Sequence, residues 1–422
     1  MQRLANFDFQ AHFSLQAPAG HAGLLTIMDR NHRKLIVVLG ALGGIGPFSI
    51  DMYLAAFPQI AADLGTDLSA VGLSLTGYFA GISLGQPCYG PLLDRFGRRA
   101  PLLIGLLLYL VATLGCMLAP NLPALVGFRI LQGMGGCAGI VAGRVVVRDN
   151  FASHEIARVL SLMMLVFGLA PIIAPVLGTW LIAYTTWRDL FAVLVVLGAA
   201  MLVASWRWVP QSRAPDPTVS LHPRDILREY VRLLATPSFR GPALACAGTS
   251  AALFAYISGA PRLFMETLSI PQEYFGYTFS LNAIGLIAGS QLNARLLRRH
   301  SPGRIACKAA LIQMTAAALL VAVAAMGLVA PAIALPALLA FVSMNSGLNP
   351  NATALALRDC TENAGRAVAL LGAMQMLAGA LSSSLVSLLD DGSERPMFLV
   401  MALCATLTWV ALRRTGVDRH LS

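Results

Sequence analysis

Long apolar segments separated by short polar ones run through the chain from Leu35 to near its C-terminal end. Each has the ~20 mostly apolar residues that a helix needs to cross a bilayer, whereas a β-barrel would show shorter segments of alternating polarity. The pattern predicts an all-α integral membrane protein with twelve transmembrane helices. In the first half of the chain the predicted spans lie near residues 35–57, 69–93, 100–119, 122–144, 158–184 and 187–209. In the second half they lie near residues 241–265, 273–297, 304–329, 331–355, 364–389 and 395–413.

One long hydrophilic stretch, residues 211–240, divides these spans six and six. Its segment "RDILREYVRLL" has the pattern of an amphipathic helix on a membrane surface. Two pseudo-symmetric six-helix halves are typical of transporters that bind their substrate near the membrane midplane, although hydropathy alone allows other twelve-helix folds. The predicted division is a disordered cytoplasmic leader over 1–33, an N-terminal half over 34–209, a cytoplasmic linker over 210–240, a C-terminal half over 241–415 and a cytoplasmic tail over 416–422.

Composition and charge placement support the membrane interpretation. Hydrophobic residues make up 57% of the chain and charged residues 12%, with a mean hydropathy of +0.70, whereas soluble domains carry about 25% charged residues. Most of the 30 Lys and Arg residues fall in segments on one side of the membrane if the spans alternate. This positive-inside pattern predicts that both termini are cytoplasmic. The net charge of +10 therefore reflects topology and not nucleic-acid binding.

Several kinds of chemistry find no support in the sequence. The seven cysteines form no CxxC pair, and all seven histidines fall outside the predicted spans, so we expect neither a disulfide framework nor a metal site. No GxxxxGK[ST] loop is present to hold a nucleotide. We therefore expect no enzymatic activity and no cofactor. The segment before the first span lacks the apolar core of a signal peptide.

An acidic residue, Asp51, lies near the end of the first apolar run, in "GPFSIDMYLAAFP". An unpaired carboxylate in hydrocarbon costs roughly 2.5–3.5 kcal/mol on insertion scales. One interpretation is a helix-end acid that reaches headgroup water. The other is functional, because Asp51 is the only acidic residue, and Arg129 the only basic one, clear of the predicted span ends. In a cavity of low dielectric constant a carboxylate can exchange a proton near neutral pH and can hold a cationic substrate.

Arg129 lies inside the fourth predicted span, in "LVGFRILQGMGG", with Gln132 three residues later on the same helical face. An arginine is always charged and needs a partner or water. Arg129 lies about 10 Å beyond the start of this run at Leu122. Snorkelling to the membrane surface is therefore strained, and we favour a functional role.

The loop after the second predicted span, "GPLLDRFGRRAPLL", fits G-x-L-x-D-R-x-G-R-R-x-x-L at every fixed position. A tight loop needs glycine where φ is positive, and the charged side chains can pair with each other or with helix ends. The alternative is a basic loop that sets topology alone. The fixed positions are Gly90, Leu92, Asp94, Arg95, Gly97, Arg98, Arg99 and Leu102.

With this loop the sequence resembles the major facilitator superfamily, whose L-x-x-x-R-x-x-Q-G pattern is also matched by Leu125, Arg129, Gln132 and Gly133. The resemblance implies that the loop is a latch between two halves, in which Asp94 meets the start of the eleventh span and Arg98 pairs with an acid such as Asp149. In the fifth span, "GLAPIIAPVLG" resembles the Gly-Pro motif of family exporters and implies a bent helix that seals against its neighbours. The residues of this hinge motif are Gly168, Pro171, Pro175 and Gly178.

Three further stretches, "DMYLAAFPQIAADL", "YISGAPRLFM" and "GLNPNATALAL", look like the bicyclomycin/chloramphenicol-resistance (Bcr/CflA) branch of the drug:proton antiporters. This resemblance implies a role for Asp51 and Arg129 in proton coupling. The substrate site would combine Asp51 with aromatic, thioether and amide side chains, as an adaptable pocket requires. The candidate residues are Tyr53, Tyr78, Gln132, Phe254, Tyr256, Asn282, Asn345, Met374 and Gln375; ordinary helix packing explains Met374 and the aromatic residues at least as well.

The predicted function is proton-coupled efflux of lipophilic drugs by alternating access, in a monomer of the bacterial inner membrane. The expected partners are small molecules, protons and the lipid bilayer. If proton and drug compete for Asp51, exchange follows. One alternative is an exporter of a cellular metabolite such as an amino acid, sugar or peptide. A membrane-embedded enzyme is the second alternative, and no nucleophile constellation supports it.

Overall fold

The computed structural model describes residues 30–151, 153–212, 214–218, 222–360 and 364–414, and its regular elements over these residues are all helices. Most of the predicted leader and all of the predicted tail lie outside the described residues. The first helix group comprises α1 (Arg30–Pro47), η2 (Phe48–Met52), α2 (Phe57–Asp63), α3 (Leu68–Phe96), α4 (Arg99–Met117), α5 (Leu122–Asn150), α6 (Ser153–Ile182) and α7 (Trp187–Trp208). After the linker helix α8 (Pro223–Ala235), the second helix group comprises α9 (Pro237–Pro261), η3 (Arg262–Thr267), α10 (Gln272–Leu296), α11 (Pro302–Ala325), α12 (Pro331–Leu357), α13 (Ala364–Leu388) and α14 (Arg395–Arg414).

Local sequence signals set where these helices begin. The Asp67 side chain caps α3 by accepting a hydrogen bond from the Ala70 amide at 2.7 Å, and Asn121 caps α5 in the same way through Ala124 at 2.9 Å. Helices α9, α11 and α12 each begin with a proline, whose missing N–H would lack a partner there in any case.

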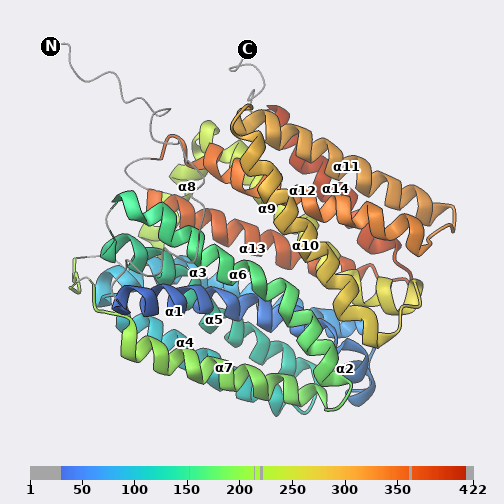
Figure 1. The fold of residues 1–422 in the computed structure, drawn as a ribbon, viewed down its shortest axis with the longest axis horizontal. Helices are drawn as coiled ribbons and strands as arrows, with labels where there is room; N and C mark the ends of the chain where they lie inside the picture. The colour runs from blue at the N-terminus through green and yellow to red at the C-terminus, as the bar shows by residue number, and fades with distance from the viewer. Residues whose placement is uncertain (1–29, 152, 213, 219–221, 361–363, 415–422) are drawn as a thin grey trace.

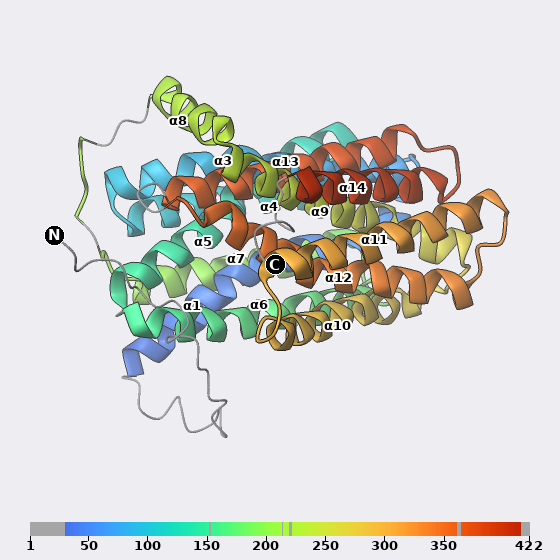
Figure 2. The same cartoon turned by 90° about the horizontal axis from the view of Figure 1, so that it is seen from above.

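Each helix group packs mainly within itself. In the first, α5 lies against α3 and α4, and α1 lies against α6; in the second, α9 lies against α12, α13 and α14. The two groups meet where α3 packs on α13 and where α6 packs on α10. Figures 1 and 2 show that α1 begins and α14 ends toward the same end of the bundle, called here the terminal end. The other end is called the distal end.

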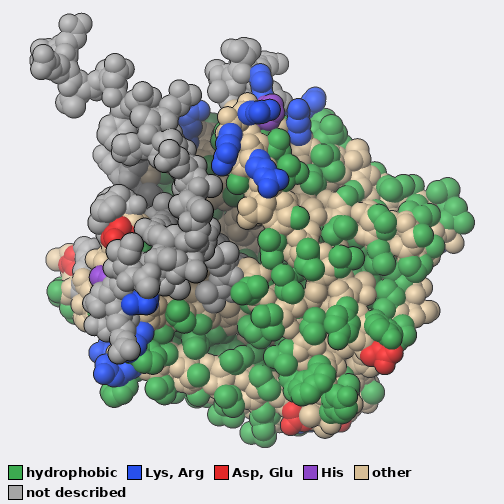
Figure 3. Space-filling model, viewed as in Figure 1, with side chains coloured by type: hydrophobic (Ala, Val, Ile, Leu, Met, Phe, Trp, Pro, Cys, Tyr) green, Lys and Arg blue, Asp and Glu red, His purple; other side chains and the backbone are tan. Residues whose placement is uncertain are grey.

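Among the described residues, ten helices are long and apolar enough to cross a membrane, and α6 adds the shorter apolar stretch Gly168–Ile182. Apolar side chains also cover much of the outer surface, as Figure 3 shows. On α14 they form a stripe at helical spacing, with Leu399, Leu403 and Leu407 each more than half exposed. The chain is therefore a multi-pass membrane protein, while the count of twelve spans and the arrangement in two halves stay predictions.

The predicted first span, 35–57, is helical over His32–Met52 but is not one regular α-helix to its end. Helix α1 ends at Pro47, a π-helical turn follows as η2, and a separate helix α2 begins at Phe57. Proline has no N–H to donate and its ring crowds the preceding turn, so Pro47 and Pro58 both favour a break in regular α-helix. The same sequence of events recurs in the second group, where α9 ends at Pro261 and the π-helical turn η3 follows.

Short α2 is tied to the start of α7 at the distal end. Arg188 donates to the Asp63 carboxylate at 2.6 Å and the Trp187 indole donates to it at 3.0 Å. The hydrogen bond from Arg188, helped by that from Trp187, lowers the pKa of Asp63. Gln59 adds a hydrogen bond to the Thr185 carbonyl at 3.2 Å. These contacts hold α2, which follows the turn that carries Asp51, against the start of α7.

The linker segment predicted to be an amphipathic helix forms α8. Tyr230, Leu233 and Leu234 pack against buried side chains of the second helix group, while Leu227 and Val231 are exposed. The predicted helix is thus confirmed. Its place on a membrane surface stays a prediction.

Candidate functional site

Asp51 lies in the π-helical turn η2, between the end of α1 and the start of α2. Its side chain is only 6% exposed, and its neighbours Ser49 and Met52 are fully buried. Among the described residues, neither a hydrogen bond nor an ion pair joins the Asp51 carboxylate to a partner. It does interact electrostatically with the hydroxyl groups of Tyr78 on α3 and Tyr256 on α9. Asp51 is therefore a secluded acid that faces both helix groups.

Helix α6 packs closely against this turn. A Cβ added to Gly178 would collide with the main-chain carbonyl of Met52, and one added to Gly276 on α10 would collide with that of Pro175. Small residues thus allow α6 to approach η2 on one side and α10 on the other. Pro175 and Gly178 of the predicted hinge motif occupy these contacts, whereas Gly168 has open space around it.

Arg129 is fully buried on α5, beside the same turn. Its guanidinium donates to the Gln132 side chain at 2.7 Å and to the main-chain carbonyl of Ser49 at 3.0 Å. Gln132 in turn donates to the Thr113 hydroxyl at 2.9 Å. These bonds confirm that Arg129 and Gln132 share a helical face, and they rule out an arginine that snorkels to the surface.

Aromatic rings enclose the Arg129 guanidinium. Its central carbon lies 4.4 Å from the ring centroid of Tyr53 and 4.5 Å from that of Tyr78, within the range of cation–π attraction. Phe191 on α7 lies further away, at 6.0 Å. The Tyr53 hydroxyl is itself held by Ser74, at 2.6 Å. The arginine charge is thus stabilised by η2, α3, α5 and α7 together, and no described carboxylate neutralises it.

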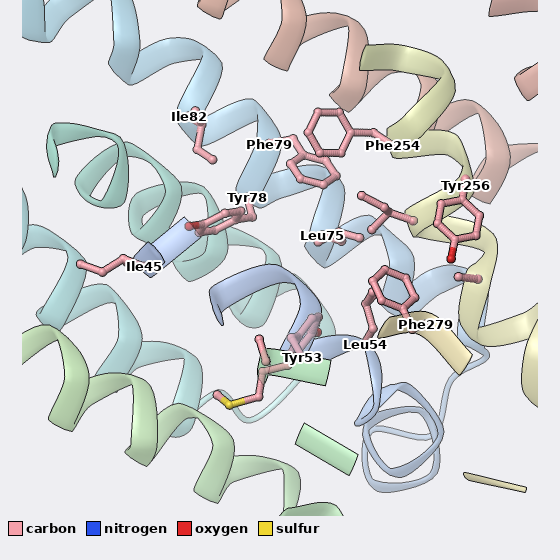
Figure 4. Close-up of a cluster of buried hydrophobic side chains, with 14 of the residues drawn as sticks. Ile45, Tyr53, Leu54, Leu75, Tyr78, Phe79, Ile82, Phe254, Tyr256 and Phe279 are labelled. Atoms are coloured by element: carbon pink, nitrogen blue, oxygen red, sulfur yellow. The ribbon is translucent and has the colours of Figure 1, made fainter. Parts of the chain in front are cut away.

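The second helix group contributes Phe254, Tyr256 and Phe279 to an aromatic cluster with Tyr53, Tyr78 and Phe79 of the first, as Figure 4 shows. Asn282 on α10 donates to the Tyr256 hydroxyl at 2.9 Å, and the Tyr256 ring stacks on Phe279 with centroids 5.7 Å apart. Phe254 meets Phe79 of α3 at 4.2 Å, across the two groups. The structure therefore brings together Asp51, Tyr53, Tyr78, Phe254, Tyr256 and Asn282 of the predicted site.

Three predicted substrate residues lie elsewhere or make no described contact with this cluster. Met374 packs against a separate buried cluster nearer the terminal end, which includes Phe239 and Cys246. Gln375 makes a hydrogen bond to the Cys246 thiol. Asn345 is buried on α12. Amino-acid type alone suggested these residues, because a span position does not reveal depth along the neighbouring helices.

Sequence reasoning missed the polar side chains that support the site. Ser49, Ser74 and Thr113 are fully buried. Their hydroxyl groups make hydrogen bonds with Tyr109, Tyr53 and Gln132, respectively. The Ser49 hydroxyl, for example, lies 2.9 Å from that of Tyr109. A polar residue within an apolar span was the available signal. It is weak, because serine and threonine can satisfy their hydroxyls on the carbonyl of the preceding turn, as Thr113 does through Tyr109.

The predicted latch loop forms a compact charged network at the terminal end. Arg98, which is fully buried, binds Asp94 at 2.6 Å and Asp149 at 2.7 Å. Gly97 has a φ of +82°, the conformation expected of a glycine in this tight loop. Arg99 donates to the Trp206 carbonyl and, through its amide, to Gln211. The predicted pair of Arg98 with Asp149 is confirmed, whereas the latch function of Gly90, Asp94, Arg95, Gly97, Arg98, Arg99 and Asp149 stays a prediction.

A second polar network joins the helix groups at the distal end. Arg262, at the start of η3, binds Asp390 at 3.1 Å and Glu266 at 3.5 Å. It also donates to the Ser69 hydroxyl of α3 at 3.4 Å, across the groups. Further cross-group hydrogen bonds join Gln272 to the Ala55 carbonyl at 2.9 Å and Thr76 to Ser383 at 2.9 Å.

The sequence profile of the Major Facilitator Superfamily matches residues 37–383. The chain belongs to this superfamily. It is 32% identical to the "Uncharacterized MFS-type transporter YdgK" of Bacillus subtilis (strain 168), with 92% of this chain and 97% of the relative covered. Such relatives identify a membrane transporter and not an enzyme, as predicted.

Two other relatives of this superfamily member carry the names of the predicted branch. The "Bicyclomycin resistance protein homolog" of Haemophilus influenzae is 28% identical over 89% of this chain and 94% of its own. The "Chloramphenicol resistance protein" of Pseudomonas aeruginosa is 29% identical over 91% and 90%. A solved structure of the xylose transporter XylE from E. coli superposes with a TM-score of 0.71 at 14% identity, covering 93% of this chain and 98% of XylE. That last likeness concerns the fold alone.

Proposed function

We propose that this chain exports lipophilic or amphipathic compounds, such as chloramphenicol- or bicyclomycin-like drugs, in exchange for protons. One observation carries the proposal: Asp51 is a secluded carboxylate without a described partner, placed in a π-helical turn, and it interacts with Tyr78 of the first helix group and Tyr256 of the second. Such turns in helices often occur at functional sites. A carboxylate so placed can bind either a proton or a cationic group of the cargo, and competition between the two produces exchange.

The surroundings of Asp51 favour an amphipathic cargo over a small polar metabolite. Two of the nearby amides are already engaged inside the protein, Gln132 with Arg129 and Asn282 with Tyr256. The Arg129 charge is likewise enclosed by tyrosine rings. The groups that remain available to a ligand are aromatic rings and one carboxylate. A sugar or an amino acid would need several directed hydrogen bonds from the site.

The transport cycle that we propose is alternating access between two six-helix halves, which correspond to the two helix groups. In this cycle the hydrogen bonds that Arg262, Gln272 and Thr76 make across the groups would close the distal end, and the cargo would enter from the terminal end. In this inward-facing state Asp51 releases its proton and the cargo binds. The groups then rock, the network at Arg98 closes the terminal end, and the cargo leaves. Protonation of Asp51 from the distal side favours the return.

The same proposal fixes the orientation in the membrane. Lys and Arg side chains gather toward the terminal end of the face in Figure 3, as the positive-inside rule requires of a cytoplasmic side. The protein would then be a monomer of the bacterial inner membrane with both termini cytoplasmic, driven by the proton gradient and needing no cofactor. Among the described residues, no group of three His, Cys, Asp or Glu side chains could hold a metal ion.

Proteoliposomes test the role of Asp51. We expect the substitution Asp51→Asn to reduce drug transport driven by a proton gradient at least about tenfold, while drug counterflow without a gradient continues. The matched control is Asp67→Asn, because Asp67 is an exposed helix cap and asparagine caps equally well. Gradient-driven transport at the wild-type rate in Asp51→Asn would refute the coupling role. Transport of polar metabolites but not of drugs by the wild type would favour metabolite export.

A further inference from the structure

A pocket of about 200 Å³ lies between α10, α11 and α12, away from Asp51. Apolar side chains supply most of its lining, among them Leu292, Leu296, Ile305 and Ile312. Leu292 is 49% exposed and Ile312 is 45% exposed, so the pocket opens sideways, where the acyl chains of a bilayer would lie. On α10 the lining begins at Gly289, about 10 Å along the helix from Asn282 of the candidate transport site.

Basic side chains border this pocket at the terminal end. Arg304 and Lys308 lie one turn apart on α11 and therefore project from the same face, and His300 precedes them in the connection from α10. Figure 3 shows Lys and Arg side chains gathered over the part of this face where α11 begins, next to a broad apolar surface.

This combination has a specific chemical complement. Arg and Lys bind phosphate oxygens through charge-assisted hydrogen bonds, and an apolar trough that opens to the bilayer accepts an acyl chain. Basic pockets between transmembrane helices are known to bind anionic lipid headgroups. An ordinary basic loop that sets topology would not require a cavity beside its charges. Inorganic phosphate would leave the trough empty, and a lipid without net charge would bring no excess negative charge to Arg304 and Lys308.

We propose that this pocket is a binding site for an anionic phospholipid such as phosphatidylglycerol. Its phosphate contacts Arg304 and Lys308, and one acyl chain lies along Leu292 and Ile312. Because the lipid bridges α10 and α11 over α12, it stabilises this corner of the second helix group. By mass action, a ligand that binds only the folded state raises the melting temperature.

The test measures lipid binding to the purified, delipidated protein by native mass spectrometry and by thermal shift. We expect phosphatidylglycerol to bind and to raise the melting temperature, whereas phosphatidylcholine and inorganic phosphate do not. The double variant R304Q/K308Q should bind phosphatidylglycerol at least about tenfold more weakly. The matched control R298Q/R299Q removes the same charge from exposed arginines that do not line the pocket and should bind like the wild type.

A second pair of variants tests the trough independently of charge. We expect Leu292→Trp to fill the pocket and weaken phosphatidylglycerol binding, and Leu281→Trp, at an exposed position of α10 outside the pocket, to leave it unchanged. Equal losses in R298Q/R299Q and R304Q/K308Q would overturn the site in favour of diffuse attraction. Equal binding of inorganic phosphate, or displacement of the lipid by a transported drug, would overturn the lipid assignment.

Discussion

At the scale of single residues, Arg129 is the side chain most dependent on its surroundings. It is a permanent charge in the interior of a membrane protein, and no described carboxylate neutralises it. Two directed hydrogen bonds and the faces of two tyrosine rings stabilise it instead. A planar guanidinium can make all these contacts at once, whereas an ammonium cannot. The several N–H donors of the planar guanidinium therefore explain why this position is occupied by arginine and not by lysine.

We accordingly expect Arg129→Lys to destabilise the folded protein by about 2 kcal/mol, since at least one charged hydrogen bond is lost. Thermal unfolding in detergent measures this as a lower melting temperature. Arg148→Lys is the matched control, because Arg148 lies exposed near the end of the same helix and should tolerate the exchange. Equal melting temperatures for the two variants would show that the guanidinium geometry does not matter.

At the scale of elements, the two π-helical turns η2 and η3 were not predicted by any pattern in the sequence. Apolar periodicity continues through Asp51, so the first span was predicted as one helix to residue 57. The prolines at 47 and 261 gave the only hint, yet Pro87 and Pro91 lie within the continuous helix α3. Proline alone therefore does not locate a break. The turn η2 packs against α6, and a contact between two helices cannot be deduced from the sequence of either one alone.

Because α6 approaches η2 closely at Gly178, a larger residue at this position should disturb the turn. We expect Gly178→Ala to shift the Met52 carbonyl, to displace Asp51 and to cost about 1–3 kcal/mol of stability through overpacking. Gly168→Ala, on the same helix, should be nearly neutral because nothing lies within 4 Å of the added methyl group. Melting temperature and gradient-driven transport together measure both effects. Normal transport by Gly178→Ala would show that the close contact of the Gly-Pro motif with η2 is not required for the function of Asp51.

At the scale of the whole molecule, hydropathy predicted nearly every helix, because burial in lipid imposes length and apolarity on each span separately. The candidate site was harder. Asp51 and Arg129 stood out as charges within spans, and the loop motif located the Arg98 network. Met374 and Gln375 were placed beside Asp51 by residue type, yet they lie with a different buried cluster. Their depth depends on how α13 is staggered against α9, a relation between helices that the sequence does not state.

The relation between the two helix groups is open to a direct test. The hydroxyl oxygens of Thr76 on α3 and Ser383 on α13 lie 2.9 Å apart, so cysteines at these positions should form a disulfide without large backbone movement. If transport requires the distal end to open, oxidised T76C/S383C should lose transport almost completely and recover it on reduction. Transport by wild-type and single-cysteine proteins under the same oxidant measures non-specific damage.

A crosslink inside one helix group is the matched control. Cys246 on α9 lies 3.5 Å from the Thr353 hydroxyl of α12, so Thr353→Cys should form a disulfide within the second group. Because that group moves as a unit in the proposed cycle, this crosslink should leave transport intact. If both crosslinks abolish transport, helices within a group must also move against one another. Undiminished transport by fully crosslinked T76C/S383C would exclude opening at the distal end, and with it alternating access through the cluster at Asp51.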